Sequence, residues 1–401
     1  MNFDQILNRR AYPSFKWHDQ ALQEHFGNDQ ALPFWVADMD FPAPPAVLES
    51  LQKRVEHGVF GYEYKTDGYF DALLGWYANR HQWTIDPAHI EACPSVLNAV
   101  SILINQHSEA GDGVIIQPPV FFEFRQIIRS NGRRIVKNPL LFENGRVERE
   151  RSGRYQIDFA DLEIKAANPK NKLLILCNPH NPIGRVWTRE ELTQVGVICQ
   201  QHNVLIIADE IHGDIIYPPH RYTPLASISK ELAQISFTCL SPAKTFNIAG
   251  MVDAITVIPN ETHRAQFRDF AHRYQINKTN VFALAAIEAA YRQGEPWLDE
   301  LLTYLQSNVD FLRAYLQKNI PQISLVEPEG TYLVWLNFAG LGLDAKALER
   351  FLAQKAQIAL NPGYWFGREG AGFARMNIAC PQSILQEALV RLARAVADIP
   401  K

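Results

Sequence analysis

Short apolar runs recur through the middle of the chain, and each ends in polar or turn-forming residues. They are GVIIQPP (113–119), KLLILCNP (172–179), VLIIADE (204–210) and ISFTCLSP (235–242). Between two of them lies TREELTQVGVICQQH (188–202), which has helical character. Runs that are apolar on both faces and alternate with helices indicate a parallel sheet covered on both sides. Because ligands bind at the carboxyl ends of the strands in such sheets, the residues there are the first candidates for chemistry.

The pattern changes near residue 286, where longer helical segments begin. EPWLDELLTYLQSNVDFLRAYLQKN and QSILQEALVRLARAVADI are helical in pattern, whereas GTYLVWLNF and FARMNIAC resemble strands. We therefore predict an α/β fold: a large domain at 48–285 with a mostly parallel sheet flanked by helices, and a smaller α+β domain at 286–401. The segment 1–47 is rich in Pro and aromatic residues, and we expect it to pack on the small domain and the cleft.

Composition and charge narrow the class of protein. Of 401 residues, 47% are hydrophobic and 20% are charged, which is typical of a soluble globular protein. The net charge of −4 gives no electrostatic reason to expect binding to nucleic acid or to an anionic membrane, since both need clustered positive charge. No apolar run has the length of a signal-peptide core or a membrane span, so we expect a cytoplasmic protein.

Two further features have structural interpretations. The charge-dense segment ENGRVERERSGR, 143–154, is expected to be a surface loop. The five cysteines are far apart and show neither the spacing of a metal site nor the logic of a disulfide framework. We expect them to be reduced and buried, and we expect no metal.

One cation draws attention in the stretch CLSPAKTFNIAG, 239–250. Lys244 follows an apolar strand by a few residues and lies among small and apolar residues. Near apolar groups an ammonium loses solvation and its pKa falls, which makes a nucleophilic amine available for Schiff-base chemistry. A lysine in a surface loop is the alternative interpretation, so the neighbouring motifs have to decide.

Asp209 ends the apolar strand VLIIADE. A carboxylate there is costly to bury unless a cation meets it, and a protonated pyridine nitrogen would be such a partner. The ion pair would hold the ring protonated and strengthen it as an electron sink. A Mg²⁺ ligand or a helix cap is the competing interpretation.

Two more motifs follow strands and offer hydrogen-bond donors. CNPHNPIGRVW places two Asn-Pro steps after a strand, which leaves Asn181 free to donate to a phenolate-like oxygen. In EACPSVLNAV, Ser95 is the predicted N-cap of an apolar helix, and the N–H groups of Ser95, Val96 and Leu97 suit a phosphate. Ser241 could add a hydroxyl to that phosphate. A simple turn and an ordinary helix cap are the alternatives.

Aromatic and basic residues complete the candidate set. QPPVFFEF offers Phe121 and Phe122 after a strand, where one ring could stack on a flat cofactor and the other pack in the core. Arg375 is a guanidinium on the half-buried strand GFARMNIAC and needs a carboxylate partner. That partner is either an internal acidic residue or the carboxylate of a substrate.

Together these motifs resemble the class I/II aminotransferase superfamily of pyridoxal-phosphate (PLP) enzymes, the fold type I group. The order matches: phosphate helix, stacking aromatic residue, Asn-Pro-x-Gly loop, Asp at a strand end, Ser-x-x-Lys and a late Arg. Within that superfamily the chain resembles the cystathionine β-lyase or C–S lyase branch of the MalY/PatB type. The segments that carry this finer resemblance are PFWVADMDFPAPPAV, GYEYKTDGYFDAL, NPHNPIGRVW, ADEIHGDI, KTFNIAG and FARMNIACP.

The resemblance implies roles for individual residues. Lys244 would bind PLP covalently and act as the acid and base, Asp209 would pair with the pyridine nitrogen, and Asn181 would donate to the ring 3′-oxygen. The remaining implied PLP contacts are Phe121, which would stack on the ring, His212, and the phosphate-binding residues Ser95, Val96, Leu97, Ser241 and Tyr62. The implied substrate contacts are Arg375, backbone near Ala37, and Tyr62, which would reach across from the second subunit of a homodimer.

Three positions depart from related patterns. His212 stands where many superfamily members have Tyr, as is usual in the C–S lyase branch. Val252 stands where many have an Arg that neutralises the phosphate, so that charge has to come from elsewhere or is absent. Phe121 stands where the branch usually offers Tyr, which removes a hydroxyl that could touch the substrate.

The activity implied by the resemblance is α,β-elimination from cystathionine or another S-substituted cysteine, which yields a thiol, pyruvate and ammonia. The main alternative is transamination of an amino acid, which would use the same residues. A regulatory or binding protein on the same fold is the third interpretation, and the complete set of Lys244, Asp209 and Arg375 argues against it.

Overall fold

The computed structural model describes residues 1–143, 153–276 and 278–399. Within them, a seven-stranded sheet forms the centre of the molecule, and all its strands run parallel except β10, which is antiparallel to both neighbours. In spatial order the strands are β2 (Ile90–Cys93), β10 (Ala254–Val257), β9 (Ser236–Leu240), β8 (Leu205–Asp209), β7 (Asn171–Cys177), β3 (Gly113–Ile116) and β4 (Arg134–Lys137).

Helices cover both faces of this sheet because its central strands are apolar on both sides. Alternate residues of β7 enter two different cores, with Leu173 and Ile175 on one face and Leu174 and Leu176 on the other, as the two-residue repeat of a strand requires. The helices of the first face are α4 (Val96–His107), α5 (Glu123–Ser130) and α9 (Glu261–Arg273). Those of the second are α6 (Phe159–Ala166), α7 (Arg189–Gln201) and α8 (Lys230–Gln234).

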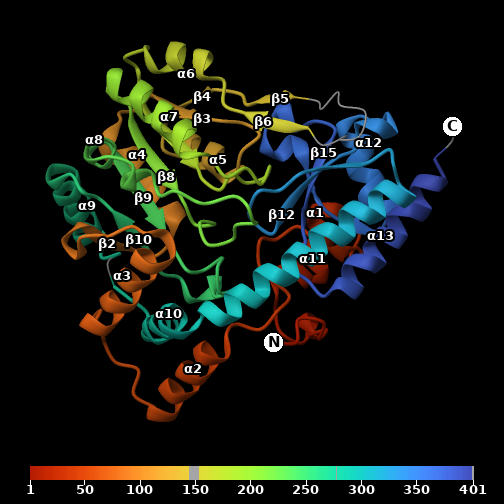
Figure 1. The fold of residues 1–401 in the computed structure, drawn as a ribbon, viewed down its shortest axis with the longest axis horizontal. Coiled ribbons are helices and arrows are strands. Elements are labelled where there is room, and N and C mark those ends of the chain that lie inside the picture. Colours follow the sequence, from red (N-terminus) through yellow and green to blue (C-terminus); the bar gives the residue numbers. More distant parts are fainter. Residues whose placement is uncertain (144–152, 277, 400–401) are drawn as a thin grey trace.

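A second sheet lies in the C-terminal third. It is antiparallel, with the order β11 (Ser324–Val326), β12 (Leu333–Asn337), β15 (Phe373–Asn377) and β14 (Asn361–Pro362). Its accompanying helices are α11 (Glu295–Asn319), α12 (Ala345–Arg350) and α13 (Gln382–Ala397). Figure 1 shows α11 crossing the molecule from the region of α10 (Val281–Gln293) toward α13.

The N-terminal segment contributes to this second part. Its helix α1 (Asp19–Phe26) packs against residues of the C-terminal third, and β1 (Leu32–Pro33) pairs in parallel with β13 (Ile358–Ala359). A short hairpin of β5 (Leu141–Glu143) and β6 (Arg154–Gln156) completes the described strands.

The predicted fold class is confirmed: a large, mostly parallel α/β sheet is joined to a smaller α+β part. The expected boundaries at 47/48 and 285/286 fall inside α2 (Pro45–His57) and α10, and α10 packs against α2 and α3 (Asp67–His81). The division into domains at those positions stays a prediction. In the predicted surface loop, residues 144–152 lie outside the described residues.

Other expectations concern the membrane, the thiols and the metal. None of the helices seen in the described ranges is long and apolar enough to cross a membrane. All five cysteines are buried and unpaired by disulfides, as predicted. In the part of the chain that the structure describes, no group of three or more His, Cys, Asp or Glu residues is placed to hold a metal ion.

Candidate active site

A pocket of about 230 Å³ lies where the candidate motifs converge. Strands β7, β8 and β9 end at its edge, and α4 begins there, because the carboxyl ends of parallel strands meet at one edge of a sheet. Ten of the twelve predicted site residues line it: Ala37, Ser95, Val96, Leu97, Phe121, Asn181, Asp209, His212, Ser241 and Lys244.

Lys244 lies in the loop after β9, and its Nζ donates to the Ala37 carbonyl at 2.7 Å. Among the described residues it forms no ion pair. Desolvation lowers the pKa of Lys244 to about 8, and nearby Arg375 acts in the same direction, whereas Asp38 and Asp209 oppose the shift. A substantial fraction of the amine is therefore neutral near pH 8, as a nucleophile or general base requires.

Asp209 is a buried carboxylate without a cation in contact. It is 5% exposed at the end of β8, and the one hydrogen bond to its carboxylate within the described residues comes from the backbone N–H of Ile211 to Oδ1 at 3.2 Å. Desolvation raises the pKa of Asp209 to about 6, while the Ile211 hydrogen bond and the charge of Lys244 oppose this shift. A carboxylate in this setting gains most from a cationic group supplied by a ligand.

Arg375 on β15 is 2% exposed and is held by neutral acceptors. Its guanidinium donates to Asn181 Oδ1 at 3.0 Å, to Asn361 Oδ1 at 2.6 Å and to the Trp35 carbonyl at 2.7 Å, while its Nε has no partner. Burial lowers the pKa of Arg375 to about 9. No carboxylate of the described chain neutralises it, so the internal salt bridge weighed as an alternative is absent from this part of the structure.

His212 follows β8 by three residues and is 3% exposed. Its Nδ1 has no hydrogen-bond partner in the part of the chain that the structure describes, and its ring lies edge-on to Tyr332. Burial lowers the pKa of His212 to about 3, with Lys244 and Arg375 adding to the shift. His212 is thus a neutral imidazole at the wall of the pocket.

The start of α4 provides amide donors. Ser95 is the N-cap, as predicted, and its Oγ accepts the Asn98 N–H at 3.2 Å. The N–H groups of Val96 and Leu97 have no carbonyl one turn earlier within the helix, so they can meet an anion. Ser241 donates its hydroxyl to the Asp253 carbonyl at 2.8 Å, and this bond fixes the loop that bears Lys244.

Phe121 and Phe122 lie in different surroundings, one at the pocket and one in the core, as expected. Phe121 lines the pocket, whereas Phe122 packs edge-on to Trp365 and Phe366. Tyr332, which the sequence analysis did not single out, donates its hydroxyl to the Ala37 carbonyl at 3.0 Å. The sequence signal that could have indicated Tyr332 is its position in GTYLVW, directly before a strand.

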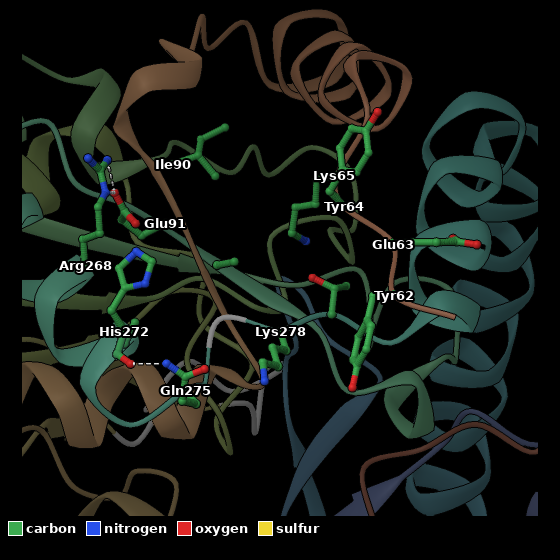
Figure 2. A pocket seen from close by; sticks show the side chains of 13 residues that line it. Tyr62, Glu63, Tyr64, Lys65, Ile90, Glu91, Arg268, His272, Gln275 and Lys278 are labelled. Atoms are coloured by element: carbon green, nitrogen blue, oxygen red, sulfur yellow. Dashed lines mark hydrogen bonds and ion pairs between the residues drawn. The ribbon is translucent and has the colours of Figure 1, made fainter. Parts of the chain in front are cut away.

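The two predicted site residues that do not line the Lys244 pocket are Arg375, which bonds the lining residue Asn181, and Tyr62. Tyr62 is 99% exposed and lines a second pocket of about 600 Å³. Figure 2 shows Tyr62 and Lys65 on one side of this second pocket and the ion pair of Glu91 and Arg268 on the other. Lys65 pairs with Asp253 at 2.9 Å, and since Asp253 also lines the Lys244 pocket, the two pockets adjoin at this pair.

A seven-stranded sheet whose strand ends bring together a lysine and a buried carboxylate, with an arginine of the second sheet beside them, defines the class of protein. Residues 36–392 match the family described as aminotransferase class I and II. The chain belongs to this family. It is 43% identical over 397 residues to cystathionine beta-lyase PatB of Bacillus subtilis, covering 99% of this chain and 100% of that protein.

Two further relatives lie in the same branch. Protein MalY of Escherichia coli is 34% identical, with 99% of each chain covered. Cystalysin from Treponema denticola, whose crystal structure contains a pyridoxal 5′-phosphate cofactor, has a TM-score of 0.94 at 35% identity, covering 100% of this chain and 99% of that one. The predicted resemblance to the PatB and MalY branch is confirmed.

Proposed function

We propose that this protein is a PLP-dependent C–S β-lyase that eliminates a thiol from cystathionine or another S-substituted cysteine. The observation that carries the proposal is a pocket lined by Lys244 and Asp209, with Arg375 bonded to its lining residue Asn181. None of these three charged groups has an ion-pair partner in the described chain. The identity of 43% to cystathionine beta-lyase PatB supports the lyase assignment over its alternatives.

The pocket fits PLP on the chemistry of its donors. Asp209 would pair with the protonated pyridine nitrogen, which would give this buried carboxylate the cationic partner that it lacks among the described residues. Phe121 would stack on the ring. The side-chain amide of Asn181, whose Oδ1 already accepts from Arg375, has its N–H donors left for the 3′-oxygen. The proposed phosphate site is the start of α4 with Ser241, and His212 would flank the ring as a neutral group.

When bound, PLP supplies an aldehyde for amines and a conjugated ring that delocalises the electron pair left at the substrate Cα. Lys244 would remove the Cα proton, because its lowered pKa makes it a base near neutral pH. Arg375 would orient the substrate through its carboxylate. The Cβ–S bond of the substrate would then break, and sulfur would leave with the electron pair and take a proton. Hydrolysis of the remaining three-carbon fragment would yield pyruvate and ammonia.

Transamination is the second candidate, since the family includes aminotransferases. Purified enzyme given cystathionine without a keto-acid acceptor distinguishes the two. We expect continuous release of pyruvate and thiol; a single partial turnover that a keto acid restarts would identify a transaminase. A regulatory protein would bind the cofactor and release no thiol from any cysteine conjugate.

The Lys244→Ala variant tests the assignment of the site. We expect it to lose pyruvate formation and the visible absorption band of the bound cofactor, because the amine serves as anchor and base. The variant Lys230→Ala, on α8 and away from the pocket, serves as control and should behave as wild type. Persistent pyruvate release by Lys244→Ala would contradict the proposal.

We also propose that Tyr62 acts in the site of a second copy of the chain, as a homodimer with shared sites requires. The full exposure of this aromatic residue in a single chain supports the proposal. Mixing the inactive variant Lys244→Ala with the impaired variant Tyr62→Ala tests it. A hybrid dimer has one complete site, so activity should reappear after subunit exchange. A mixture no more active than its components would contradict shared sites.

A further inference from the structure

Residues 36–41 form a strap across the Lys244 pocket, and its backbone faces the reactive amine. The carbonyl of Ala37 accepts Lys244 Nζ at 2.7 Å and the Tyr332 hydroxyl at 3.0 Å. An acceptor at this distance orients the lysine lone pair and holds the ammonium once it carries a proton. The position of the strap therefore bears directly on the base.

Two asparagine side chains tie the strap to the rest of the site. Asn247, three residues after Lys244, donates to the carbonyls of Met39 at 3.0 Å and Phe41 at 2.8 Å. Asn377, two residues after Arg375, does the same for two more strap carbonyls, those of Val36 at 2.7 Å and Asp38 at 2.6 Å. These bonds fix the backbone but leave the two strap carboxylates to be neutralised.

The neutralising cations come from the N-terminal segment. Lys16 is 0% exposed and pairs with Asp40 at 2.7 Å, while Arg9 pairs with Asp38 at 2.7 Å and with Asp40 at 3.0 Å. The indole of Trp17 donates to Asp40 Oδ1 at 2.8 Å. Burying a lysine completely is costly in free energy unless a carboxylate lies in close contact. Because Asp40 provides that contact, the N-terminal segment is held in one defined place against the strap.

We propose that Arg9 and Lys16 are positioning residues of the active site, which act through Asp38 and Asp40 to hold the Ala37 carbonyl against Lys244. Neither cation lines the pocket, so they act on the base only through the strap. Asp38 also raises the pKa of Lys244, so Arg9 moderates the field that the amine experiences. This inference rests on the proposed function for its catalytic consequence, but its structural content concerns the ligand-free chain.

Competitive labelling of Lys244 by acetic anhydride, read by mass spectrometry on ligand-free protein over a pH series, tests the proposal without turnover. The first variant is Arg9→Gln, which alters a partly exposed group and should fold. The second is Lys16→Met with Asp40→Asn, which removes both charges of the buried pair together. The matched control is Arg391→Gln on α13, whose arginine pairs with Glu387 and contacts the Gln357 carbonyl.

We expect Lys244 to be acetylated about threefold faster in Arg9→Gln and about tenfold faster in the double variant, because a displaced carbonyl no longer holds the amine. The control should match wild type. In active enzyme, kcat should fall in the same order. Wild-type labelling in both folded variants, with only a lower unfolding temperature, would show a structural role and overturn the proposal. If the variants label faster than wild type as expected but the wild-type enzyme releases no pyruvate, the positioning role would stand and the proposed function would be refuted instead.

Discussion

Two regions of the molecule treat buried charge in opposite ways. In the N-terminal cluster, Lys16 and Asp40 are almost completely buried and lie 2.7 Å apart. At the Lys244 pocket, the lining residue Asp209 and the neighbouring Arg375 are as deeply buried, but each contacts only neutral groups of the described chain. The charges of the first region are paired with each other, whereas those of the second have no counter-ion within the described chain.

This difference separates structural ionic groups from chemical ones. A buried ion pair with good geometry is internally satisfied, so removing one member destabilises the fold. A buried charge with no counter-ion is unfavourable in free energy and has a shifted pKa. Such groups are frequent at functional sites, where a ligand can supply the missing opposite charge. Burial alone would not have distinguished Asp40 from Asp209; their partners do.

The largest expected effect contrasts two matched substitutions, Asp209→Asn and Asp40→Asn. Asp209→Asn should reduce kcat/KM about a thousandfold, since it removes the proposed counter-ion of the cofactor ring. It should leave the stability of the ligand-free protein unchanged or higher, because the lost carboxylate had no cation. Asp40→Asn should cost about 3 kcal/mol of unfolding free energy, because it removes the close partner of buried Lys16 and leaves only Asp38 at 3.9 Å. Urea unfolding and steady-state kinetics check both; equal stability losses would break the comparison.

A second substitution tests whether Arg375 binds the carboxylate of the substrate. Arg375→Met should raise KM for cystathionine about a hundredfold, which corresponds to the loss of one desolvated charge contact. The control Arg391→Met removes an arginine on α13 that already pairs with Glu387, and its KM should not change. A normal KM with a lowered kcat would place Arg375 outside carboxylate binding.

The pH dependence of stability tests the depressed pKa of Lys244. Folding lowers the pKa of Lys244 from 10.5 to about 8, so between these pH values the unfolded chain binds more protons and the free energy of unfolding rises with pH. Relative to Lys244→Met, ligand-free wild type should gain up to about 3 kcal/mol across that window. Urea titrations at pH 7.5 and 10.5 measure the gain; a constant difference between the two proteins would contradict a depressed pKa.

The smallest expected effect concerns Tyr332. Tyr332→Phe removes one neutral hydrogen bond to the Ala37 carbonyl, and a bond of that kind is worth about 1 kcal/mol, so kcat should fall about fivefold. Tyr364→Phe, which removes a hydroxyl bonded to Lys346 and Glu349, is the control and should be neutral for turnover. A loss as large as that of Asp209→Asn would mean that Tyr332 itself touches the reacting atoms.

Much of the fold and of the candidate site was predictable because the decisive signals are local. The apolar runs became β3, β7, β8 and β9 nearly at their expected positions. Strand-end residues such as Asp209 and Lys244 then had to lie together, since parallel strands share one carboxyl edge. Ser95 capped its helix for an equally local reason.

Other features were beyond a reading of local patterns. Arg375 contacts Asn181 across 194 positions of sequence, and Lys244 contacts Ala37 across 207. The expected domain boundaries also fall inside α2 and α10, a placement that no local pattern indicated. No periodicity encodes such pairings, because they arise when separate elements pack.

The sequence by itself thus determined the strand and helix types, the kinds of functional group at the strand ends and the family, since apolar periodicity and short motifs act within a few residues. Only the tertiary structure decided which charges were neutralised and which were left open, as with Asp40 and Asp209. The physical reason is that the energy of a buried charge depends on the atoms within a few ångströms of it, and those atoms come from distant parts of the chain.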